Sequence, residues 1–314
     1  MKPSMLLMVL TLLLLNVACN QQVERSIALG VFRPGAPEIA PVERFAQDIG
    51  RRPAVVFWFQ PWLGEPRFPG EAVAMLHKRG YVPMVTWEPW DPQVGADNTR
   101  FRAARIAVGD HDSYVRAWAR AAKGAAGTVL LRFGHEMNGP WYPWGSASNR
   151  PEEYVAAFRH VVDIFRAEGA LNVRFVWAPN VEYPGSAPLF PLYPGDAYVD
   201  WICVDGFNWG TSRSDSRWEG FDQVFRSTYD QVVVLAPGKR FMVETASAEV
   251  GGDKAAWIRD ALGTQVPRRF DRIEAVLWFD ESKEADWRVT SSPEALRAFR
   301  ETVATRTYSL ALSP

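Results

Sequence analysis

Residues 128–145 read TVLLRFGHEMNGPWYPWG, and this stretch decides the fold. An apolar run, residues 128–133, is followed at once by Gly134, by His135 and Glu136, and by a loop rich in Gly, Pro and Trp. A nearly continuous apolar run predicts a strand of a parallel sheet that is buried on both faces. Polar side chains directly after such a strand lie at its carboxyl end, where βα barrels build their active sites.

The same pattern recurs along the chain. Short apolar segments rich in β-formers alternate with longer stretches of helical composition, which is typical of βα units. Eight strands are predicted, at residues 27–32, 54–59, 82–87, 128–133, 173–177, 201–207, 241–245 and 274–279. Helices are predicted at residues 70–79, 112–122, 151–168, 222–234, 254–262 and 293–302. Because no Gly-rich phosphate loop follows the first strand, an open dinucleotide-binding sheet is disfavoured. We therefore predict an α/β protein, a single (β/α)8 TIM barrel over residues 20–314.

The amino terminus predicts export. Lys2 precedes an apolar run, residues 5–15, and a small residue, Ala18, comes just before Cys19. This order is that of a signal peptide, and the apolar run is shorter than the ~20 residues that a membrane-spanning helix needs. The cysteine resembles a lipoprotein processing site, so residues 1–19 are interpreted as a signal peptide with Cys19 lipidated. The protein would then be attached to a membrane, at the cell surface or in the periplasm, and secreted if Cys19 is not lipidated.

The composition excludes some function classes. A net charge of -1 gives no reason to expect nucleic acid as a partner. Of the 14 Trp, many lie in stretches with Pro and Gly, and exposed Trp rings stack well on the apolar faces of sugars. After signal cleavage only Cys203 lies in the folded part, in an apolar run that predicts a buried thiol. We expect a monomer acting on a polysaccharide.

Hydrolysis of a glycosidic bond needs one carboxylic acid at the leaving oxygen and a second carboxylate on the other face of the sugar. Glu136 follows the fourth predicted strand and Glu244 ends the seventh, and these strands face each other across a barrel mouth. A strand-end glutamate can also be a surface charge or the partner of an arginine, but the histidine and aromatics around Glu136 favour chemistry. Other carboxylates near strand ends are Glu88, Asp205, Glu249 and Asp280.

His135 beside Glu136 raises the alternative of a zinc hydrolase. HEMNG lacks the second histidine of an HExxH motif, and its turn residues oppose the helix that motif requires. The chain has 4 His in all, so we expect no metal. A serine hydrolase is also disfavoured, because the sequence contains no Gly-x-Ser-x-Gly elbow.

Four segments in order resemble glycoside hydrolase family 26, which includes β-mannanases, β-1,3-1,4-glucanases and β-1,3-xylanases. They are HEMNGPWYPWG (135–145), YPGDAYVDWICVDGFNWG (193–210), VETASAEVGGDKAAWI (243–258) and LWFDESKEADWR (277–288). The resemblance covers essentially the whole mature chain. It implies a retaining double displacement without a cofactor, with Glu136 as acid/base and Glu244 as nucleophile. It also implies that Trp141 binds sugar, and we expect His135 to orient the substrate or the nucleophile.

One departure from the family bears on the substrate. Many of its mannanases end the sixth strand with an Asp and a Tyr that support the nucleophile, whereas this chain reads Asp205-Gly206-Phe207-Asn208-Trp209. Asn208 and Trp209 become the candidates for that support, and a mixed-linkage β-glucan is favoured over β-mannan. The other candidate substrate-binding residues are Trp87, Glu88, Trp144, Asn180 and Trp278.

The sequence thus predicts a retaining endo-β-glycanase. Two alternatives stay open: a β-mannanase or β-1,3-xylanase, and a non-catalytic lipoprotein that binds polysaccharide. Binding alone does not require a pair of carboxylates, so Glu136 and Glu244 together favour the enzyme.

Overall fold

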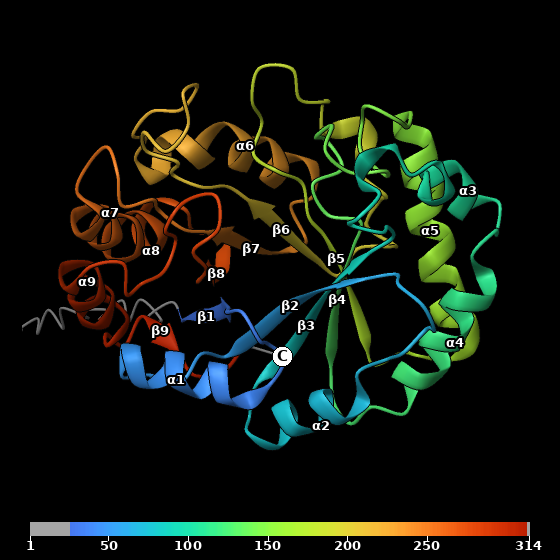
Figure 1. The fold of residues 1–314 in the computed structure, drawn as a ribbon, viewed down its shortest axis with the longest axis horizontal. Coiled ribbons are helices and arrows are strands. Elements are labelled where there is room, and N and C mark those ends of the chain that lie inside the picture. The colour runs from blue at the N-terminus through green and yellow to red at the C-terminus, as the bar shows by residue number, and fades with distance from the viewer. Residues whose placement is uncertain (1–25, 313–314) are drawn as a thin grey trace, which may run out of the picture.

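The computed structural model describes residues 26–312, and in it parallel strands close into a barrel (Figure 1). Each strand from β2 to β8 pairs with the next, and β1 pairs with both β8 and β2, which closes the ring. The strands are β1 Ile27–Phe32, β2 Val55–Pro61, β3 Val82–Glu88, β4 Val129–Phe133, β5 Val173–Trp177, β6 Trp201–Asp205, β7 Arg240–Thr245 and β8 Ile273–Phe279. The predicted (β/α)8 barrel is confirmed.

Helices surround the barrel on its outside (Figure 1). They are α1 Ile39–Ile49, α2 Gly70–Lys78, α3 Ala103–Ala107, α4 Asp112–Lys123, α5 Pro151–Glu168, α6 Phe221–Leu235, α7 Lys254–Asp260, α8 Val266–Arg269 and α9 Pro293–Val303. Short helical turns lie at η1 Gly95–Asp97, η2 Thr99–Phe101, η3 Phe190–Leu192 and η4 Ala261–Gln265. Strand β6 ends at Asp205, two residues earlier than predicted, and beyond it one bridge joins Asn208 to Ser247.

Helix α5 shows how the sequence sets an element's ends. Pro151 opens it with a fixed φ suited to a first turn, and the Glu153 carboxylate accepts a hydrogen bond from the Arg150 backbone N–H at 2.7 Å. Gly169 ends it in the left-handed conformation, at φ 79°. Its buried face repeats at helical spacing, at Tyr154, Phe158, Val161 and Phe165.

The apolar core has two layers. The outer layer fills the space between the strands and the helices, and the inner one fills the barrel itself. The inner layer includes Phe57, Met84, Leu130, Trp201 and Cys203. Cys203 is a free and fully buried thiol, as predicted. A barrel packed in this way is solid below its mouth, so chemistry is confined to the carboxyl ends of the strands.

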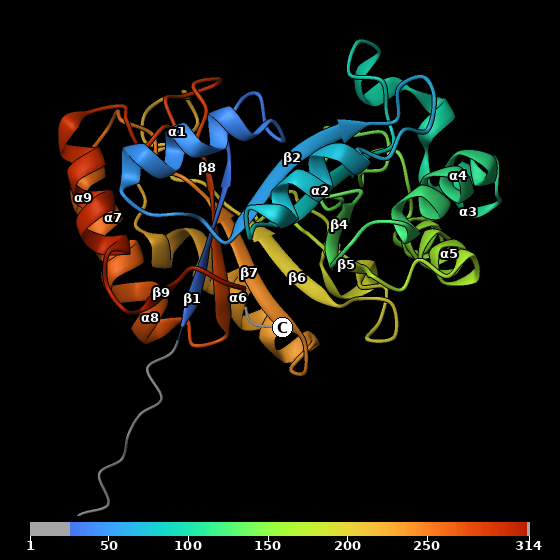
Figure 2. The same cartoon turned by 90° about the horizontal axis from the view of Figure 1, so that it is seen from below.

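The opposite end of the barrel is closed by the last part of the chain. A short strand, β9 Tyr308–Ser309, pairs in parallel with the start of β1, beside which it lies in Figure 2. Leu312 packs against the inner core layer. Within residues 26–312, no helix is long and apolar enough to cross a bilayer. The predicted signal peptide, residues 1–19, and its Cys19 lie outside the described residues.

Candidate active site

Glu136 lies just beyond β4 on an unusual backbone. Its φ is 51°, and it is the one residue other than glycine with a positive φ among residues 26–312. The backbone N–H of Glu136 donates to the Ala178 carbonyl at 2.6 Å, and its own carbonyl accepts from Gly139 at 3.0 Å. The first bond fastens the loop after β4 to the end of β5, and the second closes a turn within that loop.

Two neutral groups orient the Glu136 carboxyl. Asn180 Nδ2 donates to Oε1 at 2.8 Å, and Trp141 Nε1 donates to Oε2 at 2.7 Å. Asn180 is itself held by the side-chain amide of Asn138. Asn138 Nδ2 donates to the Asn180 carbonyl, and the Asn180 backbone N–H donates to Asn138 Oδ1, each at 2.9 Å. The carboxyl is therefore positioned without a cation in direct contact.

Glu244 lies on β7 in a different environment. Its side chain is 4% exposed and accepts a hydrogen bond from Arg132 Nη1. The same Nη1 contacts both carboxylate oxygens of Asp205, at 3.1 and 3.2 Å. Asp205 and Glu244 are register partners on β6 and β7, so the pairing of these strands brings the two carboxyls to one guanidinium.

Arg132 comes from β4 and is fully buried inside the barrel. Its Nε donates to Thr86 Oγ1 at 2.9 Å, and its guanidinium carbon lies 5.4 Å from the Phe57 ring centroid and 5.6 Å from that of Phe59. Burial opposes its charge, but the carboxylates of Asp205 and Glu244 outweigh burial and raise the pKa of Arg132. The site thus holds a permanent positive charge below Glu244.

The surroundings of the three carboxyls shift their pKa values for partly different reasons. Burial raises the pKa of Glu136, and the negative charge of Glu244 raises it further, against the hydrogen bonds from Asn180 and Trp141. Burial also raises the pKa of Glu244, but the charge of Arg132 and its hydrogen bond oppose this. Burial raises the pKa of Asp205 well above its ordinary value, and the Glu244 charge adds to the effect. Asp205 and Glu244 share the Arg132 guanidinium, so the two carboxyls titrate as one coupled pair.

His135 is a neutral, packed residue. It is 3% exposed, and both burial and the charge of Arg132 lower its pKa well below 6.5. Its Nε2 lies 3.1 Å from the Tyr142 hydroxyl, and the Tyr142 ring stacks on Trp144 at 4.4 Å between centroids. No group of three or more His, Cys, Asp and Glu side chains within residues 26–312 could hold a metal ion. The expectation that His135 orients the substrate stays a prediction.

Three of the predicted sugar-binding tryptophans are core residues, and for them the prediction is wrong. Trp87 and Trp278 are 0% exposed and Trp144 is 1% exposed. Trp278 Nε1 donates to the Trp287 carbonyl at 3.0 Å, and Trp144 Nε1 donates to the His135 carbonyl at 2.7 Å. A side chain without exposed surface cannot stack on a polymer, so these indoles hold the loops and the helix layer in place.

The candidates for supporting Glu244 also need correction. Asn208 is 0% exposed, and its side chain bonds Ser247 Oγ at 2.9 Å and the Glu219 N–H at 2.9 Å. It therefore shapes the loop after β6, and its prediction as a substrate-binding residue is wrong. Trp209 is half-buried and packs edge-on against Trp287 at 4.9 Å. The hydrogen bond on Glu244 comes instead from Arg132.

Sequence reasoning missed Arg132, although a signal for it was present. A single arginine within the apolar run of β4 has both faces of its strand buried, so its charge must find carboxylates inside the barrel. Among the other candidates, Glu88 is 5% exposed, and burial raises its pKa to about 7. Trp141 is the candidate tryptophan with the most exposed side chain, at 37%.

The closed barrel with carboxyl groups at the ends of β4 and β7 is the arrangement of a barrel glycosidase. Residues 99–261 match the model of Glycosyl hydrolase family 26, and the chain belongs to this family. The motif around Glu136 and the strand that bears Glu244 both fall within the matched residues.

Three relatives illustrate the similarity. Endoglucanase H of Acetivibrio thermocellus is 38% identical over 283 residues, which are 88% of this chain and 30% of that protein. A mannan endo-1,4-beta-mannosidase of Bifidobacterium adolescentis is 32% identical over 107 residues, 32% of this chain and 11% of that protein. The chain thus spans less than a third of the length of these curated relatives. A solved β-mannanase of Bacteroides ovatus has a similar fold, with a TM-score of 0.65 and 17% identity over 91% of this chain and 90% of that one.

Proposed function

We propose that the protein is a retaining endo-β-glycanase with Glu136 as acid/base and Glu244 as nucleophile. One observation carries the proposal: neutral donors hold the first carboxyl, and a buried arginine holds the second. A carboxyl without a cationic partner can carry a proton near neutrality, whereas one bonded to a guanidinium stays ionised. A retaining glycosidase needs this division between its two groups.

The reaction follows in two steps. Glu136 gives its proton to the leaving glycosidic oxygen while Glu244 attacks the anomeric carbon, which forms a glycosyl-enzyme and releases the reducing-end part of the chain. Glu136, now ionised, takes a proton from water, and the resulting hydroxide equivalent displaces Glu244 from the anomeric carbon. Arg132 keeps Glu244 ionised for attack and again when it leaves. No cofactor takes part.

The proposed substrate is a mixed-linkage β-glucan. Support comes from the name of Endoglucanase H, whose similarity extends over 88% of this chain, whereas the similarity to the Bifidobacterium mannosidase extends over 32%. The sequence after β6 lacks the Tyr of the mannanase pattern, which points the same way. The signal-like residues 2–19 support export, with Cys19 as the lipidated residue.

A substrate screen tests this proposal. Barley β-glucan, β-mannan and β-1,3-xylan are incubated separately with the protein and with Glu136→Ala, and reducing ends, viscosity and product lengths are followed. We expect fast loss of β-glucan viscosity by the parent, with few reducing ends per unit of viscosity lost, as endo action gives. If the protein cleaved mannan or xylan faster than β-glucan, that polymer would replace β-glucan as the proposed substrate. If the parent and Glu136→Ala released the same amount of reducing ends from every polymer, the protein would be a non-catalytic polysaccharide-binding protein instead.

A further inference from the structure

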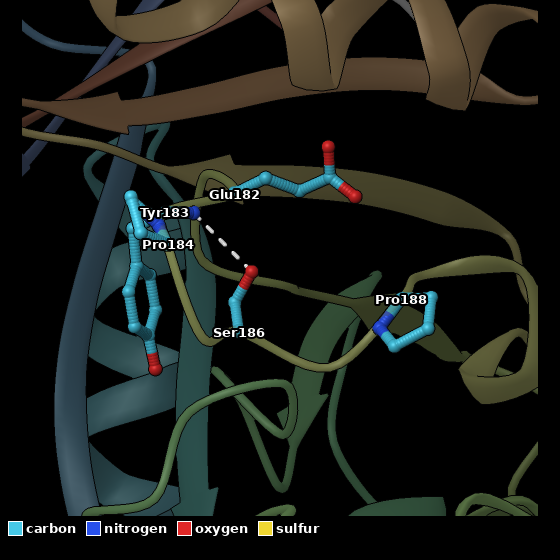
Figure 3. A pocket seen from close by; sticks show the side chains of 5 residues that line it. All are labelled: Glu182, Tyr183, Pro184, Ser186 and Pro188. Atoms are coloured by element: carbon cyan, nitrogen blue, oxygen red, sulfur yellow. Dashed lines mark hydrogen bonds between the residues drawn. The ribbon is translucent and has the colours of Figure 1, made fainter.

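The loop that follows β5 forms an open pocket at the mouth of the barrel, close to Glu136. It has a volume of about 370 Å³ and is lined by Glu182, Tyr183, Pro184, Ser186 and Pro188 (Figure 3). In Figure 3 the Ser186 hydroxyl lies between the rings of Tyr183 and Pro188. None of these residues takes part in the proposed mechanism, and none was a candidate in the sequence.

The pocket is built on a rigid turn. Pro184 and Gly185, at φ 98°, occupy the two central positions of the turn, which is the residue pattern of a type II turn. Ser186 N–H donates to the Tyr183 carbonyl at 2.9 Å, and Tyr183 N–H donates to Ser186 Oγ at 3.2 Å. Beyond the turn, Ala187 N–H donates to the Asn138 carbonyl at 3.0 Å. The shape of the pocket therefore exists before any ligand binds, which lowers the entropy cost of binding.

An aromatic surface connects this pocket with Glu136. The rings of Trp141 and Tyr183 lie 5.7 Å apart between centroids with planes inclined by 28°. Trp141 bonds the Glu136 carboxyl through Nε1. Burial and the negative charge of Glu136 both raise the pKa of Tyr183, so its phenol lies within electrostatic reach of that carboxyl. The surface runs from Glu136 through Trp141 to Tyr183.

We propose that Tyr183 and the 182–188 loop bind a sugar residue of the leaving-group part of the polysaccharide, beyond the bond that is cut. The inference rests on the proposed function. Glu136 protonates the leaving oxygen, so a surface that begins at Glu136 and continues through Trp141 follows the departing chain. The Tyr183 ring stacks on the apolar face of a sugar, and the hydroxyl of Ser186 and the carboxylate of Glu182 are polar groups for its hydroxyls.

The test uses Tyr183→Ala on two kinds of substrate. One is a mixed-linkage gluco-oligosaccharide labelled at its reducing end, and the other is an aryl β-oligoglucoside whose leaving group is 2,4-dinitrophenolate. We expect kcat/KM on the oligosaccharide to fall about tenfold, the effect of losing one aromatic contact. Labelled products should become shorter, because fewer residues are held on the leaving-group side. Hydrolysis of the aryl oligoglucoside, which has no sugar there, should be unchanged.

Two variants serve as controls. Tyr183→Phe keeps the ring and should restore the parent's labelled products. Phe190→Ala removes the side chain of an 80% exposed residue of η3, just beyond the 182–188 loop and outside the pocket lining, and should have no effect. If Tyr183→Ala left the labelled products unchanged, or slowed the aryl oligoglucoside equally, or if Phe190→Ala caused the same shift, the inference would be overturned. If the parent protein cleaved no β-glycan at all, the proposed function itself would be wrong.

Discussion

The ends of β4 and β7 present the same residue type in opposite settings. At β4, Glu136 receives hydrogen bonds from an amide and an indole, at 2.8 and 2.7 Å, and lies on a loop. At β7, Glu244 lies within a strand and shares a buried guanidinium with Asp205. The comparison teaches that burial raises the pKa of both carboxyls and that their donors differ: Glu244 has a cationic donor whose charge favours its ionised form, whereas the donors that orient Glu136 carry no charge.

The largest expected effect is the loss of activity on removing either glutamate, and rescue by added azide distinguishes the roles of the two. Glu244→Ala should lower kcat on β-glucan by about 10⁴-fold or more, since the covalent step has no nucleophile. Glu136→Ala should lower kcat/KM on the polymer by about 10²–10⁴-fold, since proton transfer is lost. Added azide should give an α-glycosyl azide with Glu244→Ala and a β-glycosyl azide with Glu136→Ala, as identified by NMR. If instead Glu244→Ala gave the β-glycosyl azide and Glu136→Ala the α-glycosyl azide, the two assigned roles would have to be reversed.

Arg132 should be the next most sensitive position. Arg132→Met leaves Asp205 and Glu244 buried without their cation and should destabilise the fold by about 3–5 kcal/mol, as measured by denaturant unfolding. The penalty should shrink as the pH falls, because the carboxyls then take up protons. Arg240→Met is the matched control, since its ion pair with Glu274, at 2.6 Å, is partly exposed and worth less than about 1 kcal/mol. If the two variants lost equal free energy of unfolding, the buried cluster of Arg132, Asp205 and Glu244 would contribute no more to stability than a partly exposed ion pair.

The smallest expected effect is a displaced pH profile. Hydrogen bonding from Asn180 favours the ionised form of Glu136 and so lowers its pKa. Activity needs Glu136 protonated and is lost as the pH rises through this pKa. Asn180→Ala should therefore move the alkaline limb of kcat/KM to higher pH and lower the maximum about tenfold, because the carboxyl is less well oriented. The acidic limb, set by Glu244, should stay in place, and a shift of that limb alone would contradict the assignment.

The fold was predictable because barrel strands are buried on both faces and leave continuous apolar runs such as VLLRF in β4. The carboxylates at the strand ends followed from the same runs. Side-chain direction was harder. Trp87 and Glu88 are neighbours on β3, and successive residues of a strand point to opposite faces, so Trp87 packs on Trp118 in the helix layer while Glu88 lies toward the barrel interior.

Contacts between distant strands were the part that the sequence could not supply. That one guanidinium holds both Asp205 and Glu244 depends on the register of β6 and β7, which places these two residues opposite each other. The pocket after β5 depends on the fastening of Ala187 to Asn138, two loops that are far apart in the chain. Local patterns determine strands and turns, but such tertiary contacts follow only once the barrel is closed.

The positive φ of Glu136 has a consequence for protein engineering. A left-handed backbone costs a residue with a Cβ about 1 kcal/mol, and glycine would adopt it freely. The chain therefore gives up folding stability at residue 136 in order to present a carboxyl there. A search for thermostable variants that ignores catalysis would favour glycine at this position, and the stability gained there would remove the carboxyl that we propose as the acid/base.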